Sequence, residues 1–179
     1  GVESYVVSEQ PVSIDSYHIF KRRDDRMFAI LQMEVYSGKS PAETAAIDAQ
    51  PTGTSGVVYD KLMIRHWDQW NPYGKRNHLF LCALNADADG LIRTDNATMI
   101  DLMFELETDC PGKNPGLGNE EYSVSTDGNY LSMACRSTQP GKPSQKMDVA
   151  WTTDVPIVLV DLTAAINRLE ISAPAAACA

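Results

Sequence analysis

Four side chains that could bind a metal or transfer protons lie close together in the sequence: Arg65, His66, Asp68 and His78. Histidine and aspartate are ordinary zinc ligands. Eleven residues separate the two histidines, and this spacing is not diagnostic of a metal site. In a strand, His66 and Asp68 would share one face and Arg65 would lie on the other. We therefore expect neither a metal nor a cofactor at this segment.

The tryptophans of the same segment favour a structural interpretation. Trp67 and Trp70 are large aromatic side chains that we expect to pack in a β-rich core. Arg65 and Asp68 would then satisfy each other, or the backbone of a neighbouring strand. We expect Trp151 to be a core residue as well.

A second group with chemical potential is the adjacent pair Glu120 and Glu121, at the start of an expected strand. Paired carboxylates can bind a free ammonium group, such as the amino end of a peptide. Such a pair at the start of a strand is also a common feature of a solvated surface, and from the residues alone we favour that interpretation.

A serine nucleophile is not predicted within these residues. The string Gly53-Thr54-Ser55-Gly56 lacks the G-x-S-x-G spacing of a nucleophile elbow. The triad of an α/β-hydrolase also needs Ser, Asp or Glu, and His in that order, and the last histidine of this chain is His78. We expect this chain alone not to hydrolyse peptides.

The amino-acid composition excludes some classes of binding partner. The 179 residues are 44% hydrophobic and 22% charged, with a formal net charge of −9, as in an ordinary globular chain. The basic run at residues 21–23 is followed at once by two aspartates, so we do not expect nucleic acid binding. No apolar stretch is long enough to span a membrane, so we expect no membrane partner and a soluble protein, secreted or cytoplasmic.

The cysteines and the single sequon are less informative. The spacings contain no C-x-x-C pair, which argues against zinc and thioredoxin-type sites. Three disulfide pairings are possible, and we favour buried free thiols over any of them. Asn96 begins a glycosylation sequon that would matter only in a secreted eukaryotic protein. The four cysteines are Cys82, Cys110, Cys135 and Cys178.

Period-two alternation of apolar residues predicts an all-β chain. Turn residues at 71–74 predict a β-hairpin over residues 59–85. Helical signals are weak, at 99–106 and 163–169, and the segments 37–56, 107–119 and 136–147 read as loops. The run at 157–162 is continuously apolar and predicts a buried strand. The other expected strands are residues 27–36, 78–84, 122–125 and 130–135.

A strand–turn–strand pattern at residues 21–33 recurs at 123–134. Repeated strand units of this kind are typical of a β-propeller, and a β-sandwich is the alternative. Four strings are more specific: R-H-W-D-Q-W at 65–70, G-N-E-E-Y at 118–122, S-T-D-G at 125–128 and A-W-T-T-D at 150–154. In this order they resemble the prolyl oligopeptidase family of serine peptidases, in the branch of dipeptidyl and acylaminoacyl peptidases. Two departures are Thr126, where the family usually has proline, and Pro156, which breaks a segment normally free of proline.

The resemblance implies that residues 1–179 are part of an amino-terminal propeller with long loop insertions. About two four-stranded blades are recognisable, over residues 14–90 and 118–165. The catalytic α/β-hydrolase domain would lie outside this chain, and the propeller would admit short peptides to it. Glu120, Glu121 and Arg65 are then the candidate substrate-binding residues.

Two further expectations accompany this interpretation. An incomplete propeller leaves sheet edges open, so we expect the chain to be a fragment or to be completed by another chain. The alternative function is a stand-alone propeller-like scaffold without hydrolase activity.

Overall fold

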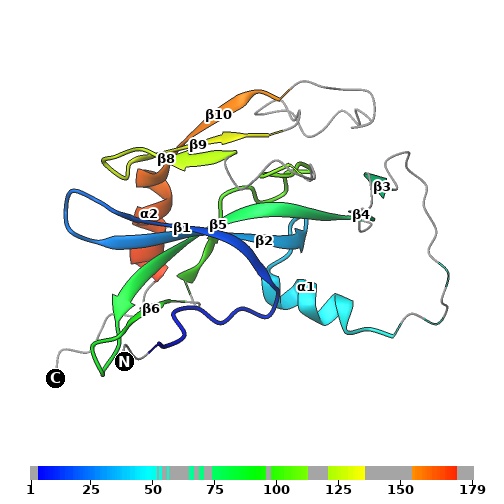
Figure 1. Ribbon diagram of the computed structural model, residues 1–179, viewed down its shortest axis with the longest axis horizontal. Helices are drawn as coiled ribbons and strands as arrows, with labels where there is room; N and C mark the ends of the chain where they lie inside the picture. The colour runs from blue at the N-terminus through cyan, green and yellow to red at the C-terminus, as the bar shows by residue number, and fades with distance from the viewer. Residues whose placement is uncertain are drawn as a thin grey trace.

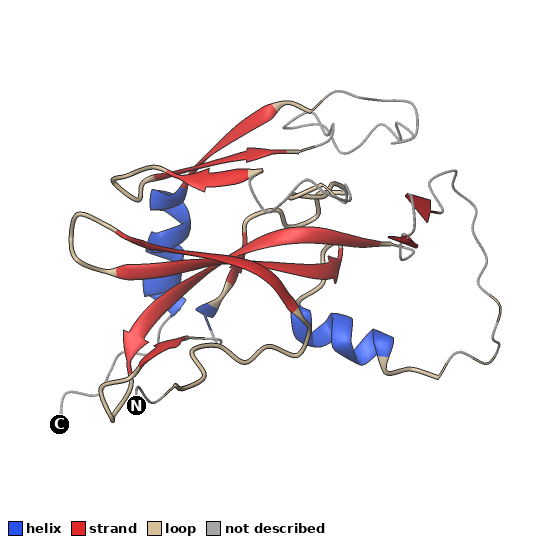
Figure 2. Ribbon diagram, in the orientation of Figure 1, coloured by secondary structure: helices blue, strands red, loops and turns tan. Residues whose placement is uncertain are grey.

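The computed structural model describes residues 4–51, 53, 56, 65–66, 69–70, 74–95, 98–112, 121–135 and 155–172 (Figure 1). Strands dominate these residues, which confirms the all-β prediction at this level (Figure 2). The elements are β1 (Ile14–Lys21), β2 (Met27–Tyr36), α1 (Pro41–Asp48), β3 (Arg65–His66), β4 (Gln69–Trp70), β5 (Lys75–Ala86), β6 (Ile92–Thr94), β7 (Ile100–Asp101), β8 (Tyr122–Val124), β9 (Tyr130–Ala134), β10 (Ile157–Asp161) and α2 (Leu162–Ser172).

The larger sheet is an antiparallel array in the order β1-β2-β5-β6, with β7 also paired to β5. Strand β2 spans the predicted residues 27–36, and β5 contains the predicted strand 78–84. Alternate residues of β2 point to opposite faces of the sheet, and both faces are buried. Phe28 and Ile30 belong to a first apolar cluster, and Leu31 and Met33 belong to a second apolar cluster on the other face. A central strand covered on both sides needs apolar residues at nearly every position.

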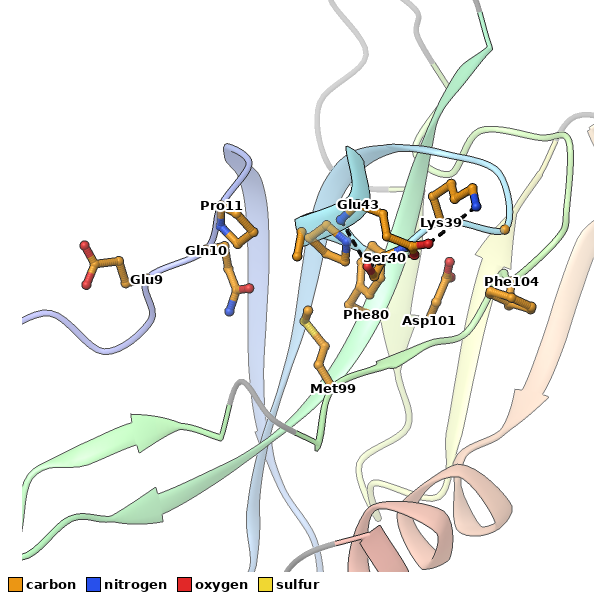
Figure 3. A pocket seen from close by; sticks show the side chains of 13 residues that line it. Glu9, Gln10, Pro11, Lys39, Ser40, Glu43, Phe80, Met99, Asp101 and Phe104 are labelled. Carbon is orange, nitrogen blue, oxygen red and sulfur yellow. Dashed lines mark hydrogen bonds and ion pairs between the residues drawn. The ribbon is translucent and has the colours of Figure 1, made fainter. Parts of the chain in front are cut away.

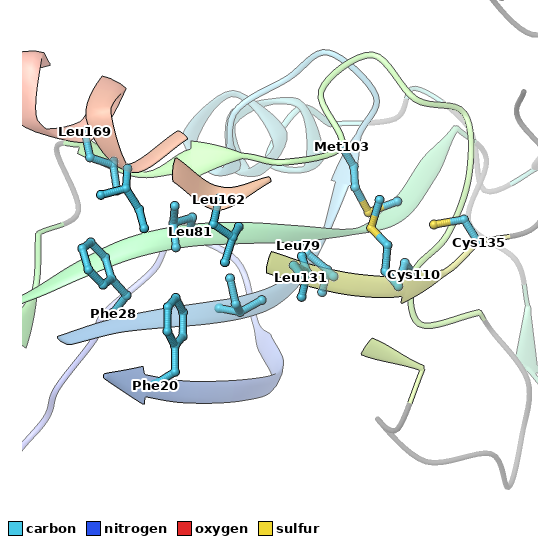
Figure 4. Close-up of a cluster of buried hydrophobic side chains, with 13 residues drawn as sticks. Phe20, Phe28, Leu79, Leu81, Met103, Cys110, Leu131, Cys135, Leu162 and Leu169 are labelled. Atoms are coloured by element: carbon cyan, nitrogen blue, oxygen red, sulfur yellow. The ribbon is translucent and has the colours of Figure 1, made fainter. Parts of the chain in front are cut away.

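The smaller sheet, in the order β10-β9-β8, lies over one face of the larger sheet together with α2 (Figure 1). Phe28 and Leu81 from the large sheet, Leu131 from β9, and Leu162 and Ile166 from α2 share one buried cluster. Figure 4 shows Phe28, Leu81, Leu131 and Leu162 converging from both sheets and the helix. This apolar layer joins the two halves of the described chain.

The opposite face of the large sheet is covered in part by the amino-terminal segment. Val12 packs against the second apolar cluster, beside Leu31 and Cys82. Farther toward the amino end, the Thr94 N–H donates to the Val7 carbonyl over 2.9 Å, which fixes this segment along β6.

Helix α1 corrects the prediction that residues 37–56 form a loop. Ser40 is the N-cap, its side chain accepts from the Glu43 N–H over 3.2 Å, and the Glu43 carboxylate accepts from the Ser40 N–H over 2.9 Å. Pro41 occupies the first turn, where its missing N–H costs nothing. The Ser-Pro-Ala-Glu string is a capping box, and it starts a helix in a segment whose composition resembles a loop.

The predicted hairpin over 59–85 lies partly outside the described residues, which include neither 59–64 nor 71–73. Strand β3 pairs antiparallel with β4, Arg65 opposite Trp70 and His66 opposite Gln69. Among the described strands, β5 pairs with β2, β6 and β7 and not with β3 or β4, so the second strand of the predicted hairpin belongs to the larger sheet.

The carboxyl-terminal strand is less buried than its composition predicts. Strand β10 lies at the edge of the small sheet, and Ile157 and Leu159 are 79% and 66% exposed, whereas Val158 and Val160 pack on the core. Although its residues are almost all apolar, β10 is therefore an alternating strand with one buried and one exposed face. Leu162 begins α2, which is longer than the predicted turn at 163–169. Residues 99–106 contain strand β7 followed by turns.

None of the helices among the described residues is long and apolar enough to cross a membrane.

Candidate functional site

Most of the site residues predicted from the sequence lie outside the described part of the chain. The backbones of Arg65 and Trp70 belong to β3 and β4, while their side chains are outside the described atoms. Four other predicted site or core residues are outside it altogether: Trp67, Asp68, Glu120 and Trp151.

Glu121 is described, and its contacts are with the backbone. Its carboxylate accepts a hydrogen bond from the Gly112 N–H, and its carbonyl oxygen accepts from the Ala134 N–H over 2.8 Å. These bonds fasten the segment before residue 113 to the small sheet. The one described member of the predicted glutamate pair thus has a structural contact in addition to its predicted role.

His78 is fully buried and hydrogen-bonded at both ring nitrogens. Nδ1 lies 2.8 Å from an Asp101 carboxylate oxygen, and Nε2 lies 3.1 Å from the Leu106 carbonyl oxygen. A carbonyl oxygen only accepts, so Nε2 carries a proton, and the bond to Asp101 requires another proton between the two side chains. Both nitrogens are occupied, which leaves no lone pair of His78 for a metal. Among the described residues, no three His, Cys, Asp or Glu side chains are grouped to hold one.

Asp101 also borders a surface pocket of about 520 Å³ between α1 and the large sheet (Figure 3). Phe80 and Met99 contribute apolar surface to it, and Phe104 contributes an aromatic ring that is 56% exposed. Other lining residues come from the amino-terminal segment and from the first turn of α1: Glu9, Gln10, Pro11, Gly38, Lys39, Ser40, Pro41, Ala42 and Glu43.

The polar groups of this pocket are largely paired with one another. Glu43 lies 3.4 Å from the Lys39 ammonium and accepts from both the backbone and the hydroxyl group of Ser40. The Ser40 N–H is the main reason that the pKa of Glu43 is below its usual value. The Ser40 hydroxyl is therefore a helix cap and not a nucleophile beside a base. Apolar surface from Phe80, Met99 and Phe104 therefore faces the pocket, and Lys39, Ser40 and Glu43 at its rim are bonded to one another.

Sequence reasoning missed Asp101 and this pocket. The pocket is assembled from residues that are up to 95 positions apart, from Glu9 to Phe104, and no local motif signals such an arrangement. A recognisable signal was the capping box of Ser40 and Glu43, which places the first turn of α1 at the pocket rim.

Comparisons with family models, with curated proteins and with solved structures found no match.

Proposed function

We propose that this chain is a non-catalytic propeller part of a serine exopeptidase resembling the dipeptidyl and acylaminoacyl peptidases. It gates and helps bind short peptides, which are cleaved on a separate α/β-hydrolase domain in the same or another chain. The observation that carries the proposal is the face-to-face packing of two antiparallel sheets, β1-β2-β5-β6 and β8-β9-β10. The strands of the smaller sheet follow one another in chain order, as in a propeller blade, whereas in the larger sheet β5 is paired to β2, and β3 and β4 lie between them in the sequence.

The tips of corresponding hairpins also support this proposal. The β1–β2 turn contains Arg22, whose guanidinium donates to the Asn129 side-chain oxygen in the β8–β9 turn over 2.8 Å. Gly128, in the same second turn, lies directly against Arg22 and Phe20. Equivalent hairpins therefore stack on one another, which is the relationship expected of consecutive repeats.

Exposed apolar residues on the outer faces are consistent with further blades. Tyr17 and Ile19 on β1 are 69% and 45% exposed, and Ile157 and Leu159 on β10 are more than half exposed. A blade in the middle of a propeller has neighbours on both faces, so apolar side chains on both outer faces fit an array that continues. A stand-alone scaffold would use the same surfaces to bind a protein partner.

The substrate-binding roles of Glu120, Glu121 and Arg65 are part of the proposal. Carboxylates would bind the ammonium group at the amino end of the peptide, and the guanidinium would bind its carbonyl or carboxylate oxygens. Glu121 is already bonded to the Gly112 N–H, so Glu120 is the better candidate for direct contact with substrate.

Hydrolysis of dipeptidyl and acylaminoacyl p-nitroanilides by the full-length protein tests this function. We expect Glu120→Gln to raise KM for substrates with a free amino end by about tenfold or more, because a charged hydrogen bond is lost. The matched control Glu107→Gln removes a carboxylate that is 47% exposed, and should leave KM unchanged. An absence of hydrolysis of either substrate class by the full-length protein would favour the scaffold.

A further inference from the structure

Two cysteines meet inside the apolar layer between the sheets. Cys110 lies in the segment after β7, and Cys135 directly follows β9; they are 0% and 3% exposed. Both belong to the cluster that joins the two sheets. Figure 4 shows the Cys135 sulfur directed toward the Cys110 side chain, below Met103.

Backbone hydrogen bonds hold the two cysteines in this position. The Cys110 N–H donates to the Asn77 carbonyl on β5 over 3.0 Å, and the Cys135 N–H donates to the Pro156 carbonyl over 3.2 Å. The Cys110 sulfur also lies 3.9 Å from the Glu121 carbonyl oxygen, which accepts from the Ala134 N–H as well. The segment of Cys110 is therefore held against the strand that leads to Cys135.

The third described cysteine is on the other side of the large sheet. Cys82 belongs to the second apolar cluster, with Leu31 and Phe80. Burial raises the pKa of its thiol to about 12, and this thiol is separated from Cys110 and Cys135 by the large sheet. Among the described cysteines, the only pair that shares a cluster is Cys110 and Cys135.

We propose that Cys110 and Cys135 are a disulfide-forming site that links the segment after β7 to the end of β9. The oxidant is a low-molecular-weight disulfide of the glutathione class. The Cys135 thiolate attacks one of its sulfurs and releases one thiol, which takes up the Cys135 proton. Cys110 then loses its proton, attacks the Cys135 sulfur of the mixed disulfide and releases the second thiol. Two protein thiols are oxidised and one disulfide is reduced to two thiols.

The more exposed of the two thiols makes the first attack. Cys135 is 3% exposed, and Cys110 is 0% exposed. The neighbouring Cys110 thiol also lowers the pKa of Cys135, so Cys135 is the attacking group and Cys110 the resolving group.

The bond would enclose the β8–β9 hairpin and Glu121 in a covalent loop. Closing such a loop reduces the freedom of the unfolded chain, so the oxidised protein should be the more stable form. It would also fix the segment of Gly112, to which the Glu121 carboxylate is bonded.

The experiment equilibrates the full-length protein with oxidised glutathione or with dithiothreitol, then alkylates it in denaturant and maps its peptides by mass spectrometry. We expect a Cys110–Cys135 peptide after oxidation, alkylated Cys82, and a Tm several degrees above that of the reduced protein. Cys82→Ala should keep the redox shift in Tm, and Cys110→Ser should abolish it.

Complete alkylation of Cys110 and Cys135 after oxidation would overturn the proposal. So would a bond from either of them to Cys82 or Cys178. The peptide map of the unsubstituted protein gives this answer even where a cysteine variant fails to fold.

Discussion

The His78 imidazole and the Asp101 carboxylate form a buried pair, 2.8 Å apart, between strands β5 and β7. Asp101 also accepts the Met103 N–H over 2.8 Å, so one carboxylate fixes both the histidine and the turn after β7. Because His78 is wholly buried, the loss of its partner would leave a polar ring without a charge to balance it.

Asp101→Asn should therefore lower the free energy of unfolding by about 2–4 kcal/mol, because it removes the charge and keeps an acceptor for Met103. Urea denaturation measures this change. Asp25→Asn is the control, since the Lys21–Asp25 ion pair is 58% and 84% exposed and contributes little. Equal stabilities of the Asp101 variant and the unsubstituted protein would mean that the pair is not formed.

Gly128 should be far less tolerant of alanine than Gly90. Both glycines have positive φ, +70° and +76°, where an L side chain is strained by about 1–2 kcal/mol. A Cβ at Gly128 would also lie 2.7 Å from Arg22 Cγ and 3.3 Å from its Cα, whereas nothing lies within 4 Å at Gly90. We expect Gly128→Ala to cost at least about 1 kcal/mol more than Gly90→Ala, measured by thermal unfolding. Equal costs would contradict the contact between the hairpin tips.

Leu131 tests the packing of the two sheets. It is wholly buried between them, so Leu131→Ala should lower stability by about 2–5 kcal/mol. Leu159→Ala makes the same chemical change on a side chain that is 66% exposed, and should cost less than about 0.5 kcal/mol. Chemical denaturation of both variants checks the difference. Similar costs at the two positions would show that the small sheet does not cover the large one in this way.

Acid should weaken the β8–β9 turn. The Asp127 carboxylate accepts from the Ser125 hydroxyl over 2.6 Å and from the Asn129 N–H over 3.1 Å, and the Ser125 bond is the main cause that lowers the pKa of Asp127. Between the folded and the unfolded pKa, the unfolded chain binds more protons. The contribution of Asp127 is thus present above about pH 4, the unfolded value, and is lost as pH falls through the lower folded pKa.

Urea midpoints at pH 7 and pH 3 measure this contribution. Asp127→Asn should reduce the drop in midpoint between the two pH values, and Ser125→Ala, which removes the main hydrogen bond, should reduce it as well. A drop as large in both variants as in the unsubstituted protein would show that this turn does not titrate with folding.

The alternation of apolar residues in β2 was sufficient to predict a strand at the right residues, because a period of two over ten residues fits no helix. The sequence of β10 could not show which of its faces is exposed. Its residues 157–160 are all apolar, so only the neighbouring strands determine which of them are buried. Helix α1 was not predicted because it is short and weakly amphipathic. The capping box of Ser40 and Glu43 was the one sequence signal that indicated a helix there.

The candidate pocket and the cysteine pair depend on contacts between distant segments. His78 meets Asp101 because β7, only two residues long, pairs with β5. Cys110 meets Cys135 because the small sheet folds onto the large one. Neither pairing has a spacing rule in the sequence, so neither could be predicted before the order of the strands was known.

We propose that this chain serves a serine peptidase site located elsewhere. Treatment of the full-length protein, together with any chain that copurifies with it, with a fluorophosphonate probe tests this, once the labelled residue is mapped. We expect one labelled serine outside residues 1–179, in an α/β-hydrolase domain. A labelled serine within these residues, or no labelled serine at all, would contradict it.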